Sequence, residues 1–352
     1  IERVMKTAGI HGFQLLAICD SGGNPVGAID NFWEPKGYVD GREFRQFCSE
    51  VVPLAWFKKA VHSNVETLVV EAGAANYYQT LSNQKLIGEL SDRSGKALQR
   101  KELVVAQIPK GTTEKYGRFE FELAQVAAPA QLNLVLRIEG TEYRNSWPIW
   151  VYPERATVAD DQIVVTPSFD AAERALNEGK RVLLSPPAEK LKGTPGRFVT
   201  VFWSPTHFSH WEKVSEAGTM GLLIDPAHPA FSSFPTDFHS NWQWWDLCRN
   251  SKALVYDGVD VQPLITVIDN YHRNRRLTNL FEVAAGKGKL MFSSIDLVSS
   301  LDGRMEARQL RHSLLQYMKS ARFDPQKIIS IQSLRQTYEV TAGVWPYLPV
   351  GY

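Results

Sequence analysis

Alternating hydrophobic and polar positions give the middle of the chain a β pattern. Between residues 60 and 153, short strand-like segments are separated by turn signals, and the sequence SDRSGK joins two of them in the manner of a hairpin. The predicted strands are 67–72, 84–90, 98–106, 117–123, 131–138 and 147–152. Short strands at this spacing predict an antiparallel β-sandwich of immunoglobulin type.

A different pattern follows, in which strand-like runs alternate with helical ones. The predicted strands are 163–166, 181–184, 198–202, 221–224, 253–256 and 264–268. Helices are predicted over 169–179, which ends on glycine, and over 304–320, which is amphipathic. The run 281–295 contains a Gly-Lys-Gly turn typical of a hairpin. This alternation predicts an α/β domain with a largely parallel sheet, after which residues 323–352 return to a β-like, aromatic composition.

The first fifty residues contain one run, residues 12–19 (GFQLLAIC), that is apolar on both faces and therefore predicts a buried parallel strand. Asp40, followed by Glu43 three residues later, predicts the start of a helix. A single parallel strand needs neighbouring strands, and we expect them outside this chain. Because the sequence opens without methionine or a signal peptide and stops on an aromatic run, we expect both ends to be cuts through a longer chain.

Composition and charge exclude several classes of protein. The 352 residues contain 39 Lys+Arg against 38 Asp+Glu, and this net charge of +1 gives no electrostatic reason to expect nucleic acid or an anionic membrane as a partner. No run of about 18 apolar residues predicts a membrane span. The 17 Phe, 12 Tyr and 10 Trp suffice for substantial cores. Three cysteines without C-x-x-C spacing predict neither a disulfide framework nor a zinc site.

Motifs for nucleophilic or nucleotide chemistry are missing from the sequence. Cys248 lies in the helix-like sequence WWDLCR without the flanking glycines of a nucleophile elbow, so we predict a small core residue there. No G-x-S-x-G surrounds any serine. The sequence GKGK at 286–289 lacks the full phosphate-loop pattern, and no G-x-G-x-x-G opens a helix, so we expect no nucleotide cofactor. The α/β domain is predicted to be catalytically silent.

The densest chemical feature is the segment 234–245 (FPTDFHSNWQWW). It places Trp242 and Trp244 beside Asp237 and His239, which is typical of sugar-binding clefts, where aromatic faces pack on a pyranose while amides and carboxylates bind its hydroxyls. Two other interpretations stay open. A helix start whose tryptophans pack in a domain interface would have the same composition, and Asp237 with His239 offers two ligands of a metal site without a third.

A second candidate site lies at the end of residues 12–19. If this run is a barrel strand, its carboxyl end faces the active site. Asp20 would then accept a hydrogen bond from a substrate hydroxyl, and Trp33 would form a stacking wall, with Gln14 and Asn31 nearby. The alternative is that Asp20 only caps the turn that follows it.

Longer stretches resemble glycoside hydrolase family 2-type proteins. GIHGFQLLAICD and the following AIDNFWEPKGYVDGREFRQFCSEVVPLA resemble the last strand of their catalytic barrel, and WPIWVYPE resembles the closing strand of the sandwich after it. Three further stretches resemble their C-terminal α/β domain, which is glutamine-amidotransferase-like without its catalytic cysteine: GTMGLLIDPAHPAFSSFPTDFHSNWQWWDL, ITVIDNYHRNRRLTNLFEVAAGKGKLMFSSIDL and ARQLRHSLLQYM. The resemblance covers roughly residues 1–322.

The resemblance implies a multidomain protein that combines α/β and all-β parts. Residues 1–58 are expected to be the last βα unit of a (β/α)8 barrel and residues 59–154 an immunoglobulin-like β-sandwich. Residues 155–322 are expected to form an amidotransferase-like α/β domain without catalytic cysteine, and residues 323–352 to begin a further β-rich segment.

The resemblance also implies an exo-acting retaining β-glycosidase, in which two carboxylic acids about 5–5.5 Å apart act as nucleophile and acid/base. In the family both come from earlier barrel strands, so no catalytic residue is carried over to this chain. The family's loop His-Asp-Phe-Pro-Gly-Gln-Gly corresponds here to CDSGGN at 19–24, with Cys19 in place of His and without Phe-Pro. This departure indicates either altered specificity or a non-catalytic relative.

Two functions are therefore expected. The chain is either the C-terminal part of such a glycosidase, shaping the pocket rim and holding domains or subunits together, or a non-catalytic carbohydrate-binding or assembly module. The implied partners are a carbohydrate and the upstream part of the same protein, with a homo-oligomer left open, and no cofactor is expected. The family also implies a periplasmic or secreted location.

Overall fold

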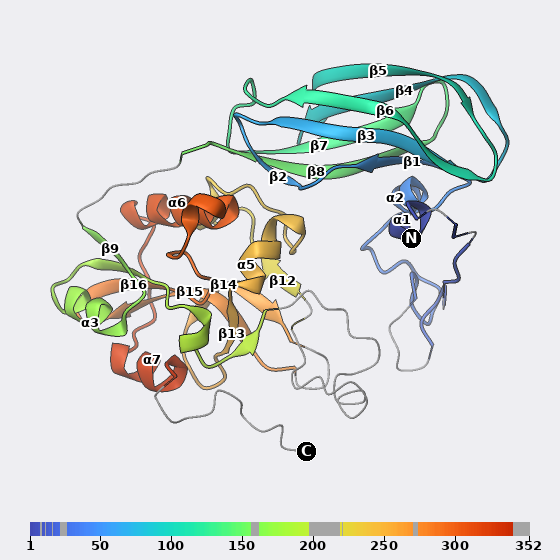
Figure 1. Cartoon of the computed structure of the whole chain (residues 1–352). Helices are drawn as coiled ribbons and strands as arrows, with labels where there is room; N and C mark the ends of the chain where they lie inside the picture. Colours follow the sequence, from blue (N-terminus) through green and yellow to red (C-terminus); the bar gives the residue numbers. More distant parts are fainter. Residues whose placement is uncertain are drawn as a thin grey trace. The chain divides into compact units, whose positions relative to one another are not determined.

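The computed structural model describes residues 1–7, 9–10, 12–15, 17–21, 27–155, 162–196, 219, 221–269 and 274–340. The chain divides into two compact units, Ile1–Val151 and Tyr152–Tyr352. In Figure 1 the first unit contains the blue and blue-green strands and the second the yellow and red elements.

The first unit is built on two antiparallel sheets. The three-stranded sheet has the order β1 (Val51–Trp56), β3 (Thr67–Asn76) and β6 (Thr112–Glu122). The five-stranded sheet has the order β2 (Val61–Ser63), β8 (Arg144–Tyr152), β7 (Ala130–Ile138), β4 (Leu81–Asp92) and β5 (Ala97–Ile108). All six predicted strands of this region are confirmed, and so is the hairpin between β4 and β5. The β-sandwich is therefore the architecture that the alternating pattern encodes.

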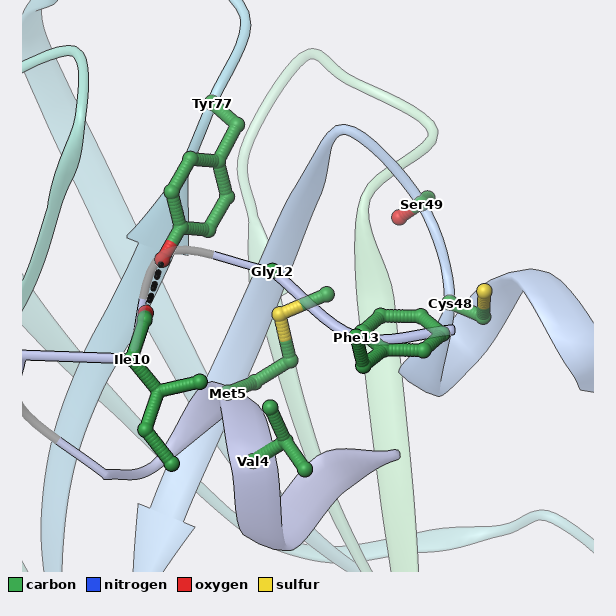
Figure 2. Close-up of a pocket in the computed structure, with 8 residues that line it drawn as sticks. All are labelled: Val4, Met5, Ile10, Gly12, Phe13, Cys48, Ser49 and Tyr77. Carbon is green, nitrogen blue, oxygen red and sulfur yellow. Dashed lines mark hydrogen bonds between the residues drawn. The ribbon is translucent and has the colours of Figure 1, made fainter. Parts of the chain in front are cut away.

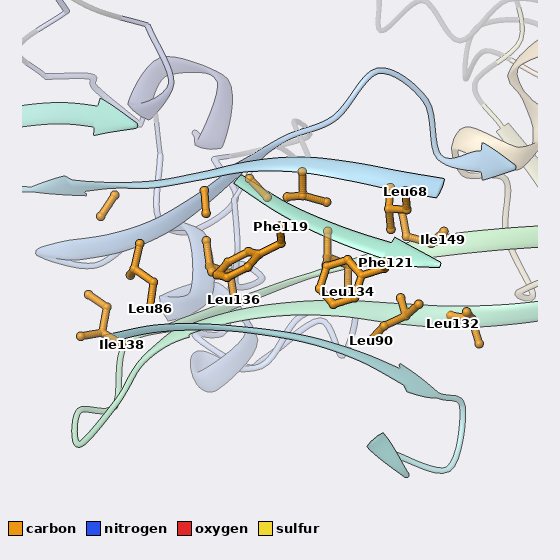
Figure 3. Packing of buried hydrophobic residues seen from close by; sticks show 14 of the residues in the cluster. Leu68, Leu86, Leu90, Phe119, Phe121, Leu132, Leu134, Leu136, Ile138 and Ile149 are labelled. Carbon is orange, nitrogen blue, oxygen red and sulfur yellow. The ribbon is translucent and has the colours of Figure 1, made fainter. Parts of the chain in front are cut away.

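The core of this sandwich lies between the two sheets, as Figure 3 shows. Strand residues alternate between the inner and outer face, so Phe119 and Phe121 of β6 are buried while their neighbours along the strand are exposed. They pack with Leu86 and Leu90 of β4. Gly88 lies between these two leucines, and a Cβ there would be 2.7 Å from the Phe119 ring, so only glycine fits beneath it.

Strand β1 is not among the strands that the sequence analysis predicts. It pairs antiparallel with β3, from Val51 opposite Asn76 to Trp56 opposite Glu71, so residues 51–56 belong to the sandwich rather than to a preceding barrel piece. Its residues read as one continuous apolar run because both faces are covered. The outer face receives Met5, which packs with Val52 and Leu54.

Two short helices precede the sandwich in the chain. Helix α1 (Glu2–Met5) is held by Glu2, whose carboxylate accepts a hydrogen bond from Trp147 Nε1 at 3.0 Å, and by the Lys6 ammonium 5.5 Å from the Trp147 ring centroid. Helix α2 (Gly41–Phe47) begins after Asp40, whose side chain accepts from the Glu43 backbone N–H, as the capping pattern predicts.

The buried strand predicted over residues 12–19 is not found. None of its described residues lies in a strand, and Cys19 forms only an isolated parallel bridge to Ile29. Phe13 is 40% exposed, Leu15 45% and Ile18 65%. A strand that is apolar on both faces is buried only when strands and helices surround it, and the described part of the chain does not surround this one.

The second unit contains an eight-stranded sheet. One path through it has the order β11 (Thr194–Pro195), β13 (Lys252–Val255), β15 (Leu277–Ala285), β16 (Gly288–Ser293), β10 (Arg181–Leu184) and β9 (Ile163–Thr166). Strand β14 (Gln262–Ile268) pairs with both β15 and β12 (Gly221–Ile224). Five of the six predicted strands are thus confirmed, and the sixth, 198–202, lies outside the described residues.

The expectation of a largely parallel sheet is wrong. Among the described strands, the parallel pairings are those of β10 with β9 and with β16, and the other pairings are antiparallel. Strands β15 and β16 form an antiparallel hairpin, whose turn has Gly286 at φ 59°, so the GKGK sequence is a hairpin turn, as predicted. Because β13, β14 and β16 all pair antiparallel with β15, these three strands run in one direction and β15 runs against them.

Helices cover both faces of this sheet (Figure 1). Helices α3 (Phe169–Asn177) and α7 (Ile331–Tyr338) pack in one core with β10, β15 and β16. Helix α6 (Met305–Lys319) lies on the other face. The other helical segments among the described residues of this unit are α5 (Trp245–Arg249), η1 (Ala188–Lys190), η2 (Pro229–Phe231), η3 (Trp242–Trp244) and η4 (Leu301–Gly303).

The predicted start of a β-rich segment at residue 323 is not observed up to residue 340. Phe323 is buried, and α7 contributes Leu334 and Tyr338 to the core of the second unit. These residues therefore complete the α/β unit instead of opening another domain. Residues 341–352 lie outside the described part. Within that part, no helix is long and apolar enough to cross a membrane.

Candidate functional site

The tryptophan-rich segment 234–245 is anchored by backbone hydrogen bonds to strand β12. The Ile224 N–H donates to Phe238 O at 2.8 Å, and Leu223 forms an antiparallel bridge with His239, so this segment extends the edge of β12. Asn241 then caps η3: its side-chain oxygen accepts from the Gln243 N–H at 3.2 Å. Backbone pairing on one side and a helix cap on the other fix the position of the tryptophans that follow.

The three tryptophans have different environments. Trp244 is fully buried, its Nε1–H donates to Thr236 Oγ1 at 2.9 Å, and its ring packs edge-on against Phe234. Trp242 and Trp245 are 56% and 42% exposed, with ring centroids 6.0 Å apart. Residues three apart share a helix face, so the outward pair is Trp242 with Trp245. The prediction that Trp244 contacts a sugar is therefore wrong, because its ring is buried in the core of the second unit.

Polar groups accompany the outward pair. The Asp237 carboxylate accepts from Asn241 Nδ2 at 2.7 Å, and the Arg249 guanidinium lies 5.7 Å from the Trp245 ring centroid. His239 is exposed, with its ring 4.6 Å from that of Phe238. In the described chain, no group of three His, Cys, Asp or Glu side chains is placed to hold a metal. Flat aromatic faces suit the C–H face of a sugar ring, and carboxylate and amide groups are of the types that bind its hydroxyls.

Cys248, in α5 just after the tryptophans, is unsuited to nucleophilic chemistry. The side chain is 4% exposed, and burial raises the pKa of the thiol to about 12. A catalytic cysteine needs a thiolate near neutral pH, which requires the opposite shift. Cys248 is the small core residue that the sequence analysis predicts.

We therefore expect iodoacetamide at pH 8 to label Cys19 and Cys48, which are partly exposed, well before Cys248. With a pKa of about 12, the Cys248 thiolate is present at roughly one part in ten thousand at that pH. Peptide mass spectrometry after timed labelling measures the three rates. Labelling of Cys248 as fast as Cys48 in the folded protein would contradict this environment.

The carboxyl ends of the parallel strands, where α/β sheets commonly bind ligands, are occupied by the chain itself. Ser185, after β10, donates to Ile295 O at 2.8 Å and accepts from the Leu297 N–H at 2.9 Å. Ser293, at the end of β16, donates to the same carbonyl at 2.9 Å. Both serines are fully buried, and their hydroxyls fix the chain after β16.

The N-terminal candidate residues are only partly brought together. Asp20 Oδ1 lies 2.5 Å from Lys36 Nζ and accepts from the Gly27 N–H at 2.8 Å, and the hydrogen bond from Lys36 lowers the pKa of this carboxyl. Asp20 therefore holds the loop together, which is closer to the turn-capping alternative than to a substrate contact. Gln14 and Asn31 are exposed, and Trp33 is 69% exposed.

A cavity of about 420 Å³ lies elsewhere in the first unit, and Figure 2 shows its lining. The lining residues are Val4, Met5, Ile10, Gly12, Phe13, Cys48, Ser49 and Tyr77. Two of its polar groups are engaged: the Tyr77 hydroxyl donates to Ile10 O at 3.4 Å, and the Ser49 hydroxyl donates to Val51 O at 2.7 Å. None of the predicted site residues lines this cavity, and its apolar walls do not suit a sugar.

Sequence reasoning missed Trp245 and Lys36. The sequence contains a signal for Trp245, because a helix that starts at Asn241 places positions 242 and 245 on one face. It contains no signal for Lys36, because the ion pair joins Lys36 to Asp20, sixteen positions away in the chain, and no repeating pattern links the two positions.

Two family models match the chain. The model described as "Domain of unknown function (DUF8487)" matches residues 163–339, half of the chain, so the chain belongs to this family. A second, "Domain of unknown function (DUF8488)", matches residues 66–153. No curated protein matches the chain.

Several solved structures are similar to parts of the chain. A β-glucuronidase from glycoside hydrolase family 2 has a TM-score of 0.20 and 15% identity, covering 27% of this chain and 10% of its own. A β-glucosidase from Listeria innocua in complex with glucose has a TM-score of 0.23, 13% identity, and coverage of 30% and 16%. A β-glucuronidase from Parabacteroides merdae has a TM-score of 0.22, 10% identity, and coverage of 38% and 21%. The likeness to glycosidases is weak and partial, and this chain spans between 10% and 21% of the length of these proteins.

Proposed function

We propose that this chain is a non-catalytic, carbohydrate-contacting portion of a β-glycosidase-type protein. The observation that carries the proposal is the outward pair Trp242 and Trp245, whose ring centroids lie 6.0 Å apart on a segment fixed by backbone pairing and a helix cap. Exposed indoles add little to the stability of the fold. Contact with the C–H face of a pyranose would cover them, while the neighbouring Asp237 and Asn241 are of the types that bind sugar hydroxyls.

The proposed parent activity is exo-acting, retaining hydrolysis of a β-glycosidic bond, with the catalytic acids contributed by another part of the protein. The proposal of this activity rests on the sequence resemblance to glycoside hydrolase family 2-type proteins. The buried Cys248 thiol and the engaged serines at the carboxyl ends of β10 and β16 support a non-catalytic role for the second unit. In this arrangement the chain contributes the rim of the pocket and contacts between domains.

The run 12–19 supports the same proposal. Its exposed Phe13, Leu15 and Ile18 have the composition of a strand that is buried on both faces, yet they lie outside any sheet. We propose that the upstream part of the protein supplies the neighbours of this run and thereby completes a (β/α)8 barrel.

The proposal predicts that the isolated chain does not hydrolyse 4-nitrophenyl β-glycosides but binds β-linked oligosaccharides, and that Trp242→Ala or Trp245→Ala weakens this binding about tenfold. A tenfold loss corresponds to about 1.4 kcal/mol, which is a reasonable contribution for one stacked aromatic ring. Isothermal titration calorimetry measures the affinities, and release of nitrophenolate measures hydrolysis.

Ile328→Ala is the matched control, because this side chain is apolar, 83% exposed and also in the second unit. Hydrolysis by these 352 residues would contradict the proposed absence of catalytic acids. Unchanged glycan affinity in both tryptophan variants would contradict the assigned surface. Loss of self-association in those variants, without glycan binding by the parent chain, would instead favour an assembly module.

A further inference from the structure

Strand β15 carries a buried carboxyl group that is not part of an ion pair. Glu282 is 7% exposed, and its Oε2 accepts a hydrogen bond from the Tyr317 hydroxyl of α6 at 2.9 Å. Among the described residues, no cation lies within ion-pair distance of this carboxyl. Burial without a paired cation penalises the ionised form, and it raises the pKa of Glu282.

The Tyr317 hydroxyl lies within hydrogen-bond distance of two acceptors. Its oxygen is 2.9 Å from Glu282 Oε2 and 3.2 Å from the Arg322 carbonyl oxygen. Burial raises the pKa of the Tyr317 phenol, which therefore keeps its single proton, and an ionised Glu282 competes with Arg322 for it. A protonated Glu282 ends the competition, because its own O–H donates to the phenol oxygen and the phenol proton goes to Arg322. Both hydrogen bonds therefore form together when Glu282 carries a proton.

The charged groups around Glu282 favour the protonated state. Asp324, which follows α6, is a like charge and raises the pKa of Glu282 further. Lys289 of β16 acts in the opposite sense, but its ammonium group is already bonded to Asp324 Oδ1 at 2.7 Å. His228 packs edge-on against the Tyr317 ring, with centroids 5.3 Å apart, and burial lowers the pKa of its imidazole, so it adds no cation at neutral pH.

The hydrogen-bonded pair lies where the α6–α7 connection, residues 320–330, meets the sheet. Arg322 belongs to the first turn of this connection. Further along, the Ala284 N–H of β15 donates to the Lys327 carbonyl at 2.7 Å, and the Ala284 carbonyl accepts from the Ile329 N–H at 3.0 Å. The connection is therefore attached to β15 at two places, and the bond to Arg322 is the one that depends on a proton.

We propose that Glu282 and Tyr317 form a proton-dependent clasp that holds the α6–α7 connection against the sheet. In the closed clasp, Glu282 donates to Tyr317 and Tyr317 donates to Arg322. When the Glu282 proton leaves for solvent, the carboxylate takes the phenol hydrogen bond and the Arg322 carbonyl loses it. Folding raises the pKa of this carboxyl, so its contribution to stability is present at low pH and is lost as the pH rises through the folded-state pKa. The clasp is independent of carbohydrate binding.

The test compares Glu282→Gln with the parent full chain between pH 5 and pH 8. The amide has the shape of the protonated carboxyl and donates to Tyr317 at every pH, so this variant keeps the clasp closed. Amide hydrogen exchange of peptides from the α6–α7 connection, read by mass spectrometry as protection factors, measures the connection locally. Protection in the parent is expected to fall about fivefold from pH 5 to pH 8, the effect of one hydrogen bond, and to stay within about twofold in Glu282→Gln.

Two further variants complete the comparison. Tyr317→Phe removes both hydrogen bonds, so it is expected to show the low protection of the parent at pH 8 throughout the range. Glu178→Gln is the matched control, because this carboxyl is in the same unit but exposed beside Lys180, which lowers its pKa and keeps it ionised from pH 5 to pH 8. It is expected to reproduce the parent profile.

Histidines titrate in the parent and in the variants alike, so the comparison cancels their effect. Parallel profiles in the parent and Glu282→Gln would overturn the proposal, because the carboxyl would then be ionised already at pH 5. An equally large pH-dependent loss of protection in peptides of α3 would also overturn it, because the proton would then act on the whole unit and not on the α6–α7 connection.

Discussion

Replacing Trp244 with alanine is expected to lower the free energy of unfolding of the second unit by about 3–5 kcal/mol. The side chain is fully buried, its ring centroid lies 5.2 Å from that of Phe234, and its Nε1–H donates to Thr236 Oγ1 at 2.9 Å. Alanine leaves a large cavity in this aromatic cluster and removes the hydrogen-bond donor. Denaturant unfolding followed by far-UV circular dichroism measures the change, with the transition of each unit fitted separately because two units need not unfold together.

Trp242→Ala is the matched control two residues away. Its ring is 56% exposed, so its removal is expected to cost less than about 1 kcal/mol. Trp244→Phe is expected to fall between the two, because it keeps most of the ring volume and loses the N–H. Equal destabilisation by Trp242→Ala and Trp244→Ala would show that the division into one core ring and one surface ring is wrong, and the proposed sugar-contacting pair with it.

The sandwich could be predicted from the sequence because its information is local. Inward residues alternate with outward ones along each strand. The apolar residues Phe119 and Phe121, two positions apart, therefore predict both the strand and the face that is buried. The helix over Phe169–Asn177 was predictable for a related reason: Gly179 has φ 82°, which marks its end. Strand β1 escaped prediction because Met5 covers its outer face and removes the alternation.

The direction of strands in the second unit could not be predicted in the same way. The sequence predicts the strands β13 and β14 themselves. It does not predict their antiparallel pairing with β15, because several strands far away in the sequence could pair with them. A pattern of alternating strands and helices suggests parallel crossovers, and it does not reveal that β15 and β16 form a hairpin inside the sheet. Element positions are local properties of the sequence, whereas sheet order is not.

The candidate sites show the same difference between features that are local in the sequence and features that depend on the fold. Composition alone identified the segment 234–245, yet which ring faces outward depends on helical phase, and this separates Trp245 from Trp244. Asp20 was singled out for its place after an apolar run. Its pairing with Lys36 follows from loop closure through Gly27, which no spacing rule anticipates.

Replacing Arg304 with alanine is expected to destabilise the second unit by about 3 kcal/mol, at the lower end of the range for removing one partner of a buried ion pair. Arg304 Nε donates to Asp246 Oδ2 at 2.8 Å, and its Nη1 lies 3.5 Å from Asp296 Oδ2. The arginine side chain is only 13% exposed, so its loss leaves the partly buried carboxylates of Asp246 and Asp296 without the cation that they share.

The exposed counterpart is Arg100, which also lies near two carboxylates, those of Glu102 and Glu139, on the outer face of the sandwich. Its side chain is 44% exposed, so Arg100→Ala is expected to cost no more than about 0.5 kcal/mol, and 1 M NaCl should abolish even that. The Arg304→Ala effect should persist in 1 M NaCl, since burial protects the pair from screening. Arg304→Lys is expected to recover only part of the loss, because an ammonium cannot reach both Asp246 and Asp296 with the fork of a guanidinium. Equal and equally salt-sensitive losses at positions 100 and 304 would mean that Arg304 is a surface residue and that α5 and α6 are not joined through it.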